Sequence, residues 1–292
     1  MKYDFSNGKE LFELTKKYSL PISEIMILRE IERSEKTRIE IIDEMNLNYE
    51  VMKRAVHKGI EEKQSSVTGF TGGDAMNMFR YAKRSFMGER MCMSVAAALG
   101  VVEVNSAMGA IVAAPTAGAS GILPGALYCA NLCGGISEEQ LVTSLFTAGA
   151  IGMIIAVNAT IAGSEGGCQA ETGVAAAMAA AALVELRNGS AKKSLHAAAI
   201  ALKNVMGLVC DPIAGLVECP CIKRNAIGVT NAILCADLAL AGVESIIPFD
   251  EVVSAMMSVG RAMSPDLRET AKGGLAATPT GKELLRRMRE TP

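Results

Sequence analysis

Two long stretches of this chain carry no charged side chain, and they constrain its fold more than any other feature. Residues 104–137 and 140–164 contain no Asp, Glu, Lys or Arg. Uncharged runs of more than about 18 residues are typical of membrane spans. Both runs, however, are broken by polar residues, and they lack the flanking basic asymmetry and the Trp/Tyr belt of a membrane helix. We therefore interpret them as helices buried among other helices, in a protein without membrane association.

The composition predicts an all-α fold. Half of the residues are hydrophobic, but only 4% are aromatic, Trp is absent and there are 17 Met. Small side chains let helices approach closely, and Met fills irregular gaps between them. The alternation of apolar and polar residues that marks strands is scarce. We expect a single large helical domain with Ala/Gly-rich buried core helices.

Residues 1–70 are charged and amphipathic, and we interpret them as a peripheral N-terminal helical region in front of a core domain at 71–292. Helical spacing of apolar residues predicts a helix that begins at Ser23, two short helices at 37–45 and 49–63, and a loop at 65–73. Asp74 is expected to cap the next helix, toward Ser85. Further helices are predicted at 90–102, 121–133, 138–161, 170–187, 190–206, 224–240, 249–260 and 282–289.

The net charge indicates which partners to expect, and the N-terminal sequence indicates the compartment. The net charge is −2, and no basic face indicates nucleic-acid binding. The N-terminus has no apolar signal-peptide core, so a cytoplasmic protein is expected. In that compartment the eight cysteines should be reduced core residues or metal ligands rather than disulfides.

Three cysteines differ from the others in their local context. Cys168 follows a glycine turn, Cys210 precedes Asp211-Pro212, and Cys221 directly precedes a predicted helix. Thiolate ligands suit such helix ends, where free backbone N–H groups favour negative charge. The separations of 42 and 11 positions match neither ferredoxins nor common zinc modules, so the spacing alone also allows three buried core cysteines. We interpret four others as core residues: Cys92, Cys129, Cys133 and Cys235.

Several long motifs resemble the alpha subunit of iron–sulfur-dependent L-serine dehydratases. They are GCQAETGVAAAMAAAALVEL, GLVCDPIAGLVECPCIKRNAIG, RETAKGGLAATP, PTAGASGILPG and TGGDA, and the likeness runs from about residue 20 to 279. The resemblance implies a [4Fe–4S] cluster held by Cys168, Cys210 and Cys221, and no pyridoxal phosphate. Cys219 stands where the family commonly has an aliphatic residue, so it is not counted as a ligand.

The resemblance also implies an activity and a partner. The reaction would convert L-serine to pyruvate and ammonia, with an iron that lacks a thiolate acting as a Lewis acid. Single-chain members have an additional N-terminal domain, and some have a Cys-bearing tail; this chain ends without Cys and resembles the two-subunit version. A beta subunit is therefore expected, and a higher oligomer stays open. The two histidines, His57 and His196, are interpreted as structural, so the catalytic base is unassigned and expected on the beta subunit.

Two further segments are candidates for the site. In the loop 115–121, Thr116, Gly118 and Ser120 could hold a substrate carboxylate through hydroxyl and N–H groups, although a tight turn between packed helices explains the same residues equally well. A cation in Lys223-Arg224-Asn225 could neutralise cluster or carboxylate charge, and a solvated helix start is the alternative.

The sequence leaves three rival functions to be distinguished from this one. A dehydratase that uses pyridoxal phosphate needs a Schiff-base lysine and an α/β fold. Lys223 is the one candidate for that lysine. A cysteine desulfidase-like lyase on the same domain would expel sulfide instead of water. A non-catalytic helical membrane or interaction protein is the alternative from a different class.

Overall fold

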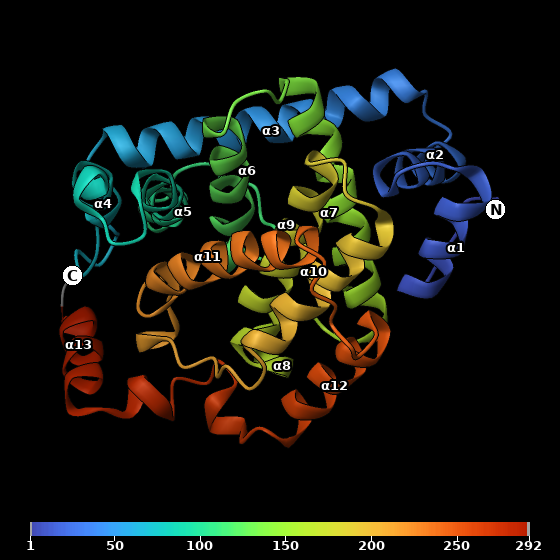
Figure 1. The fold of residues 1–292 in the computed structure, drawn as a ribbon. Helices are drawn as coiled ribbons and strands as arrows, with labels where there is room; N and C mark the ends of the chain where they lie inside the picture. Colours follow the sequence, from blue (N-terminus) through green and yellow to red (C-terminus); the bar gives the residue numbers. More distant parts are fainter. Residues whose placement is uncertain (1, 291–292) are drawn as a thin grey trace.

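The computed structural model describes residues 2–290, and within that range the chain is helical (Figure 1). No β-sheet occurs in this range, and an isolated bridge pairs Cys210 with Arg268. The all-α prediction is therefore confirmed. The α-helices of this range are α1 Gly8–Tyr18, α2 Ile22–Ser34, α3 Arg38–Glu61, α4 Asp74–Tyr81, α5 Glu89–Ser106, α6 Ile122–Leu132, α7 Glu138–Asn158, α8 Gly163–Gly166, α9 Thr172–Leu186, α10 Ala191–Asn204, α11 Cys221–Leu240, α12 Phe249–Ala262 and α13 Pro279–Glu290.

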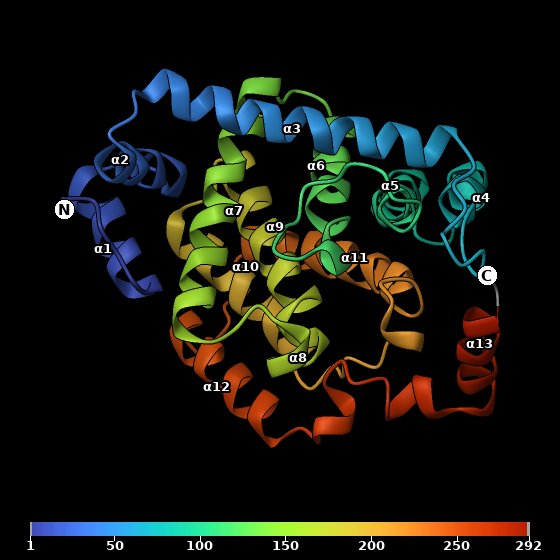
Figure 2. The same cartoon turned by 180° about the vertical axis from the view of Figure 1, so that it is seen from behind.

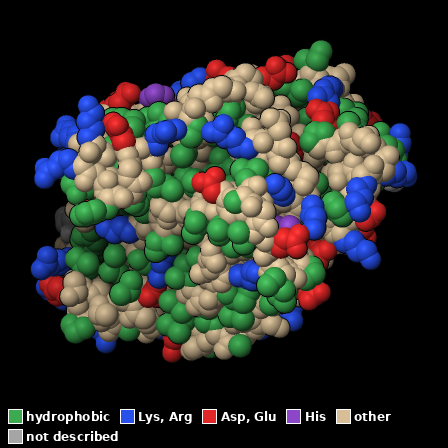
Figure 3. All heavy atoms as spheres, in the orientation of Figure 1, with side chains coloured by type: hydrophobic (Ala, Val, Ile, Leu, Met, Phe, Trp, Pro, Cys, Tyr) green, Lys and Arg blue, Asp and Glu red, His purple; other side chains and the backbone are tan. Residues whose placement is uncertain are grey.

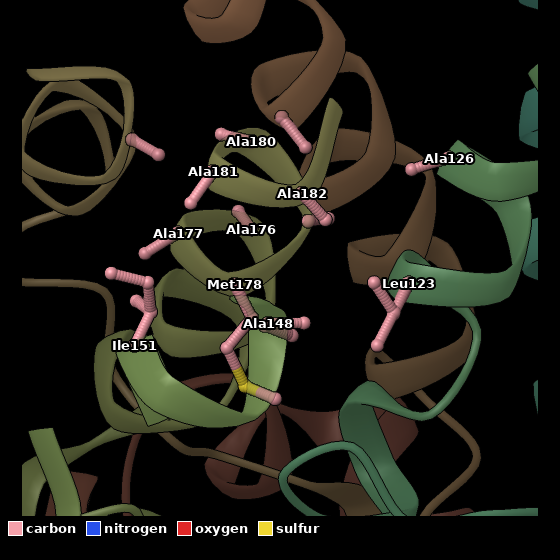
Figure 4. Close-up of a cluster of buried hydrophobic side chains, with 14 of the residues drawn as sticks. Leu123, Ala126, Ala148, Ile151, Ala176, Ala177, Met178, Ala180, Ala181 and Ala182 are labelled. Atoms are coloured by element: carbon pink, nitrogen blue, oxygen red, sulfur yellow. The ribbon is translucent and has the colours of Figure 1, made fainter. Parts of the chain in front are cut away.

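Helix α9 is the centre of the core. It packs against α6, α7, α10 and α11, and all of its residues except Glu185 are buried. Figure 4 shows its alanines facing Leu123 and Ala126 of α6 and Ala148 and Ile151 of α7. Because alanine adds a single methyl group, the four surrounding helices can approach α9 from every side. The expected Ala-rich buried core is thus present.

The two uncharged runs have different structures. The first run contains the end of α5, an irregular segment and α6, so it is not one long helix. The second run is mostly α7, which is the one helix in the described part of the chain that is long and apolar enough to cross a membrane. In α7, 61% of the most apolar window is buried inside the protein, against α2, α3 and α9. A core helix of a helical protein has these properties.

The N-terminal helices lie at the outside of the molecule but share its core. Helices α1 and α2 form one edge, and α3 runs across the neighbouring helices (Figures 1 and 2). Phe5, Leu11, Ile22 and Ile25 are buried in the same apolar cluster as α9. The region 1–70 is therefore peripheral in position, yet no separate core sets it apart from residues that follow.

The prediction of two short helices at 37–45 and 49–63 was wrong, because α3 runs unbroken from Arg38 to Glu61. It begins at a capping box, in which Thr37 and Glu40 each accept a hydrogen bond from the other's backbone N–H. Two asparagines in mid-helix disfavour helix by less than about 1 kcal/mol each. The buried face formed by Tyr49 and Met52 continues across them and outweighs that cost.

Two other local predictions also need correction. Helix α1 was missed although Asn7 caps it, with its side chain accepting a hydrogen bond from Glu10 N. Its first N–H groups, at Gly8 and Lys9, also donate to the Asp250 carboxylate of α12, 242 and 241 positions away. Asp74 is not the cap of α4, because Gly73 takes that position with φ of 82°. The Asp74 carboxylate instead accepts a hydrogen bond from Lys223 Nζ at 2.6 Å.

Helices α3 and α5 cross so closely at Gly59 that one added methyl group there should strongly lower the free energy of unfolding. A Cβ atom at Gly59 would lie 2.3 Å from Gly100 Cα, which is backbone that cannot move aside. Gly59→Ala is expected to lower the free energy of unfolding by about 3 kcal/mol, the upper range for overpacking. Urea unfolding followed by circular dichroism measures this. Gly149→Ala in α7 is the control, since nothing lies within 4 Å of its Cβ position and alanine should stabilise that helix by up to about 1 kcal/mol.

Candidate active site

The three predicted cysteines lie on three different kinds of backbone. Cys168 begins a short 3-10 turn between α8 and α9, directly after Gly167 with φ of 75°. Cys210 is in an extended segment: its N–H donates to the Leu267 carbonyl at 2.8 Å, and its carbonyl accepts from Glu269 N at 2.7 Å. Cys221 is the first residue of α11. Cys210 is therefore held by bonds from a distant part of the chain, whereas Cys168 and Cys221 bond to Thr172 and Asn225, each four residues further on.

The fold brings these three thiols together. All three side chains are buried, at 4%, 3% and 7% exposure for Cys168, Cys210 and Cys221. Burial raises the pKa of the Cys210 thiol, and ionisation of Glu171, Cys168 or Cys221 would raise it further. Burial also raises the pKa of Cys221 to about 12, with the charge of Cys168 as the next cause. The three sulfurs thus lie within electrostatic reach of one another and are protonated in the cluster-free protein at neutral pH.

The donor set can be tested against the expected cofactor. Within residues 2–290, no three His, Cys, Asp or Glu side chains converge closely enough to hold a single metal ion. A four-iron cluster does not need that convergence, because each thiolate binds a different iron corner. Three buried thiols from separate segments, free of disulfides and near enough for the charge of one to act on the others, fit such a cluster in the chemistry of their donor atoms.

Glu171 connects the cysteines to the loop at 115–121. Its Oε1 accepts a 2.7 Å hydrogen bond from Thr116 Oγ1, and its Oε2 lies 3.8 Å from Cys210 Sγ. Burial raises the pKa of this carboxyl group, and the Thr116 hydrogen bond opposes that shift. A side chain at Gly163 would come within 2.7 Å of Glu171 Oε2 and 2.9 Å of Cys210 Sγ, so glycine is required there.

The three predicted substrate residues have different surroundings. Thr116 bonds to Glu171, and a Cβ at Gly118 would lie 3.6 Å from the same carboxylate, so both residues adjoin the cysteine site. Ser120 is fully buried, and its hydroxyl donates to the Ala117 carbonyl at 2.8 Å. This bond gives Ser120 a role in folding the loop and leaves its hydroxyl turned toward the protein's own backbone.

Asn225 fixes this loop to the helix that begins at Cys221. Its Oδ1 accepts from Gly121 N at 3.0 Å, and its Nδ2 donates to the carbonyls of Gly118 and Cys221 at 2.7 and 2.9 Å. The side chain is completely buried. This amide therefore links the loop directly to the helix turn that begins at Cys221.

The three residues Lys223, Arg224 and Asn225 have different contacts and different roles. The Lys223 side chain is 62% exposed and pairs with Asp74, as expected for a solvated helix start. Arg224 is buried, and its guanidinium binds the Asp211 carboxylate and the Val209 carbonyl, both at 2.7 Å. Asn225 holds the loop. Lys223 is thus a solvated helix start, whereas neutralisation of cluster or substrate charge by a cation of this segment stays a prediction.

The remaining candidates lie outside this cluster. His57 is on the exposed side of α3, 3.1 Å from Glu61, and His196 on α10 accepts from Ser245 N. Neither imidazole is among the main influences on the pKa values of the three thiols. The sequence missed Glu171 and Asn225 as site residues. The available signal was their helical spacing, three positions after Cys168 and four after Cys221.

The raised pKa values predict slow alkylation of the site thiols. At pH 8 a thiol with a pKa of about 12 has about a thousandfold less thiolate than an ordinary cysteine. Iodoacetamide should therefore modify Cys221 in the cluster-free protein at least about a thousandfold more slowly than the less buried Cys219. Mass spectrometry of the peptide that contains both residues measures the two rates. Equal rates in the folded protein would contradict the buried site, and unfolding in guanidinium should equalise them.

The charged surface does not single out another site on the face that contains α10 and α11. In Figure 3, Lys and Arg side chains are interspersed with Asp and Glu around areas of hydrophobic and uncharged atoms.

Comparison with known proteins gives consistent results. A family model described as serine dehydratase alpha chain matches residues 17–276. The probable L-serine dehydratase alpha chain of Bacillus subtilis is 51% identical, with 96% of this chain and 94% of that protein covered. The L-serine dehydratase alpha chain of Peptoniphilus asaccharolyticus is 44% identical over 96% of this chain and 97% of that protein. The L-serine dehydratase of Streptomyces coelicolor is longer: a match of 38% identity covers 94% of this chain but 61% of that protein.

Proposed function

The chain belongs to the serine dehydratase alpha chain family, and from this premise we propose that it is the alpha subunit of an L-serine dehydratase whose [4Fe–4S] cluster is bound by Cys168, Cys210 and Cys221. The reaction eliminates water from L-serine to give aminoacrylate, which tautomerises and takes up water again to release pyruvate and ammonia. The observation that carries the cofactor proposal is the burial of three disulfide-free thiols from separate segments, with Cys210 Sγ 3.8 Å from Glu171 Oε2 and the charge of each thiol acting on the others. When bound, the cluster supplies a Lewis acid at the iron that no thiolate ligates.

The chain's own residues would bind and orient serine beside that iron. Thr116 and Gly118 adjoin Glu171, whose other oxygen lies 3.8 Å from Cys210 Sγ, and the Gly118 carbonyl is held by Asn225. The Thr116 hydroxyl can exchange its bond to Glu171 for one to the substrate, and the glycine lets the substrate approach the backbone. Thr116 and Gly118 are only partly buried, so both stay accessible to a substrate. Ser120 keeps its structural role in the loop.

A base must remove the Cα proton, and we propose that it comes from a beta subunit. The relatives' description as alpha chains implies an enzyme of several subunits. Neither histidine of this chain belongs to the cysteine site, so no imidazole of the chain is placed for this step. A partner that supplies the base would also close the site. We propose that the assembled enzyme works in the cytoplasm.

The proposal is tested by anaerobic reconstitution of the purified chain with iron and sulfide, followed by pyruvate assays with and without the beta subunit. We expect about four irons and four sulfides per chain, and pyruvate from serine at full rate only with both subunits. Cysteine as substrate is the comparison, and the relatives' names favour serine. Absence of bound iron and sulfide would refute the cluster. Full activity of the alpha chain alone would refute the assignment of the base.

A further inference from the structure

A buried ion pair lies directly behind the cysteine site. Arg224 is 9% exposed and Asp211 is 3% exposed, and Arg224 Nη2 lies 2.7 Å from Asp211 Oδ1. Arg224 Nη1 donates to the Val209 carbonyl, also at 2.7 Å. One guanidinium therefore binds the residues on both sides of Cys210. Because Arg224 stands on the first turn of α11, three residues after Cys221, the same side chain links two of the proposed ligands.

The pair also holds the chain beyond the site. The second oxygen of Asp211 accepts a 2.8 Å hydrogen bond from Leu275 N, and a side chain at Gly274 would come within 2.3 Å of that oxygen. The Cys210 segment is thus fixed from one side by Arg224 and from the other by residues 267–275. The carboxylate of Asp211 has hydrogen-bond donors for both of its oxygens.

The charge of Arg224 acts on the thiols. Its guanidinium binds the residues on both sides of Cys210 and belongs to the first turn of the helix that Cys221 begins, so its positive charge lies near these two thiols. Three thiolates in a buried place would be strongly destabilised without a compensating charge. A buried Arg–Asp pair by itself is weak evidence for stability, because desolvation of both ions offsets their attraction. The position of Arg224 next to the thiols suggests a second role, in which its positive charge compensates the negative charge of the thiolate ligands.

We propose that Arg224 is a positioning residue for the cluster, which offsets the thiolate charge and, through Val209 and Asp211, holds Cys210 at a fixed place relative to Cys221. This inference rests on the proposed function. Arg224 and Asp211 would then determine how tightly the cluster is bound and what its midpoint potential is. Loss of a supporting contact of this kind typically weakens metal binding about 10–100-fold.

The test compares Arg224→Gln, Arg224→Lys and Asp211→Asn after anaerobic reconstitution, with Lys223→Gln as the matched control. Two readouts other than activity are used: the rate at which a chelator removes iron, and the midpoint potential of the cluster. Arg224→Gln should lose iron about 10–100-fold faster and have a lower midpoint potential, because a nearby positive charge is gone. Arg224→Lys should restore the potential but not the full iron retention, since lysine lacks the two-pronged geometry. Asp211→Asn should lose iron faster without lowering the potential.

Lys223→Gln should match the wild type in both readouts, because Lys223 is exposed and pairs with Asp74. An unchanged potential and unchanged iron loss in Arg224→Gln would overturn the inference. If Arg224→Gln fails to fold, Arg224→Lys decides: iron loss at the wild-type rate would overturn the inference equally. Failure of the wild-type chain to take up iron and sulfide is a different result, which refutes the proposed function itself.

Discussion

Replacement of Cys210 by alanine is expected to prevent cluster binding and to lower serine dehydration by at least about a thousandfold. Lewis-acid assistance by a metal contributes several kcal/mol to the transition state, and a loss of about 4 kcal/mol corresponds to that factor. The bonds of the Cys210 backbone to Leu267 and Glu269 do not involve the side chain, so the alanine variant should keep the local fold and lose only the thiol. Iron and sulfide analysis of the anaerobic protein, together with pyruvate release by the assembled enzyme, measures the effect.

The same result is expected for Cys168→Ala and Cys221→Ala, and the chain offers a close control. Cys235 lies on the same helix as Cys221, is equally buried and has a pKa likewise raised to about 12 by burial. It contacts Asn204 and Asn231 instead of the other site thiols. Cys235→Ala and Cys219→Ala should keep full cluster content. Loss of iron in Cys235→Ala as severe as in Cys221→Ala would contradict the proposed ligand set.

The positions of most helices could be predicted from local sequence patterns. The apolar spacing of α7 and the alanine-rich sequence of α9 are strong signals, since neither could form a half-exposed strand or a solvated helix. The failures have identifiable causes. Helix α1 has a local signal that the prediction overlooked, the Asn7 cap, and the distant carboxylate of Asp250 adds to it. The middle of α3 depends on the burial of Tyr49 and Met52, a tertiary contact that outweighs local propensity.

The candidate site was less accessible to prediction. The three cysteines were selected through a resemblance, because their spacing alone also allowed buried core residues. Nothing local indicates that Cys210 meets Cys221, since the bridge to Arg268 fixes it from a segment 58 positions later. Glu171 and Asn225 are polar residues near helix starts, where such residues are ordinary. Their roles become visible only in the structure, where the loop at 115–121 bonds to both side chains.

Removal of the Asn225 amide is the second change with a large expected effect. Asn225→Ala leaves the Gly121 N–H and the Gly118 carbonyl without their buried partner, at a cost of about 1–3 kcal/mol for each group. The loop cannot relax inward, because a Cβ at Gly121 would already lie 2.0 Å from the Ala98 carbonyl oxygen, which shows how closely the backbones meet. We therefore expect the loop to move away from the cysteines.

Such a displacement should affect catalysis more than cluster binding. A shift of about 1 Å in a substrate-positioning group can lower kcat/KM about a hundredfold, whereas Cys221 keeps its place at the start of α11. Asn231→Ala is the matched control. Asn231 is buried on the same helix, donates to the Ala201 carbonyl at 2.9 Å and accepts from Asn204, so its loss should destabilise the fold without touching the loop.

Both variants should therefore unfold at lower urea concentration than the wild type, by similar amounts, while their activities differ. Assays are run at a temperature at which both remain folded. Normal kcat/KM in Asn225→Ala would show that the loop position does not matter for serine. An equal loss of kcat/KM in Asn231→Ala would show that the effect of Asn225 reflects general destabilisation. A hundredfold loss confined to Asn225→Ala, with full iron content, is the result expected if the loop at 115–121 orients the substrate beside the three cysteines.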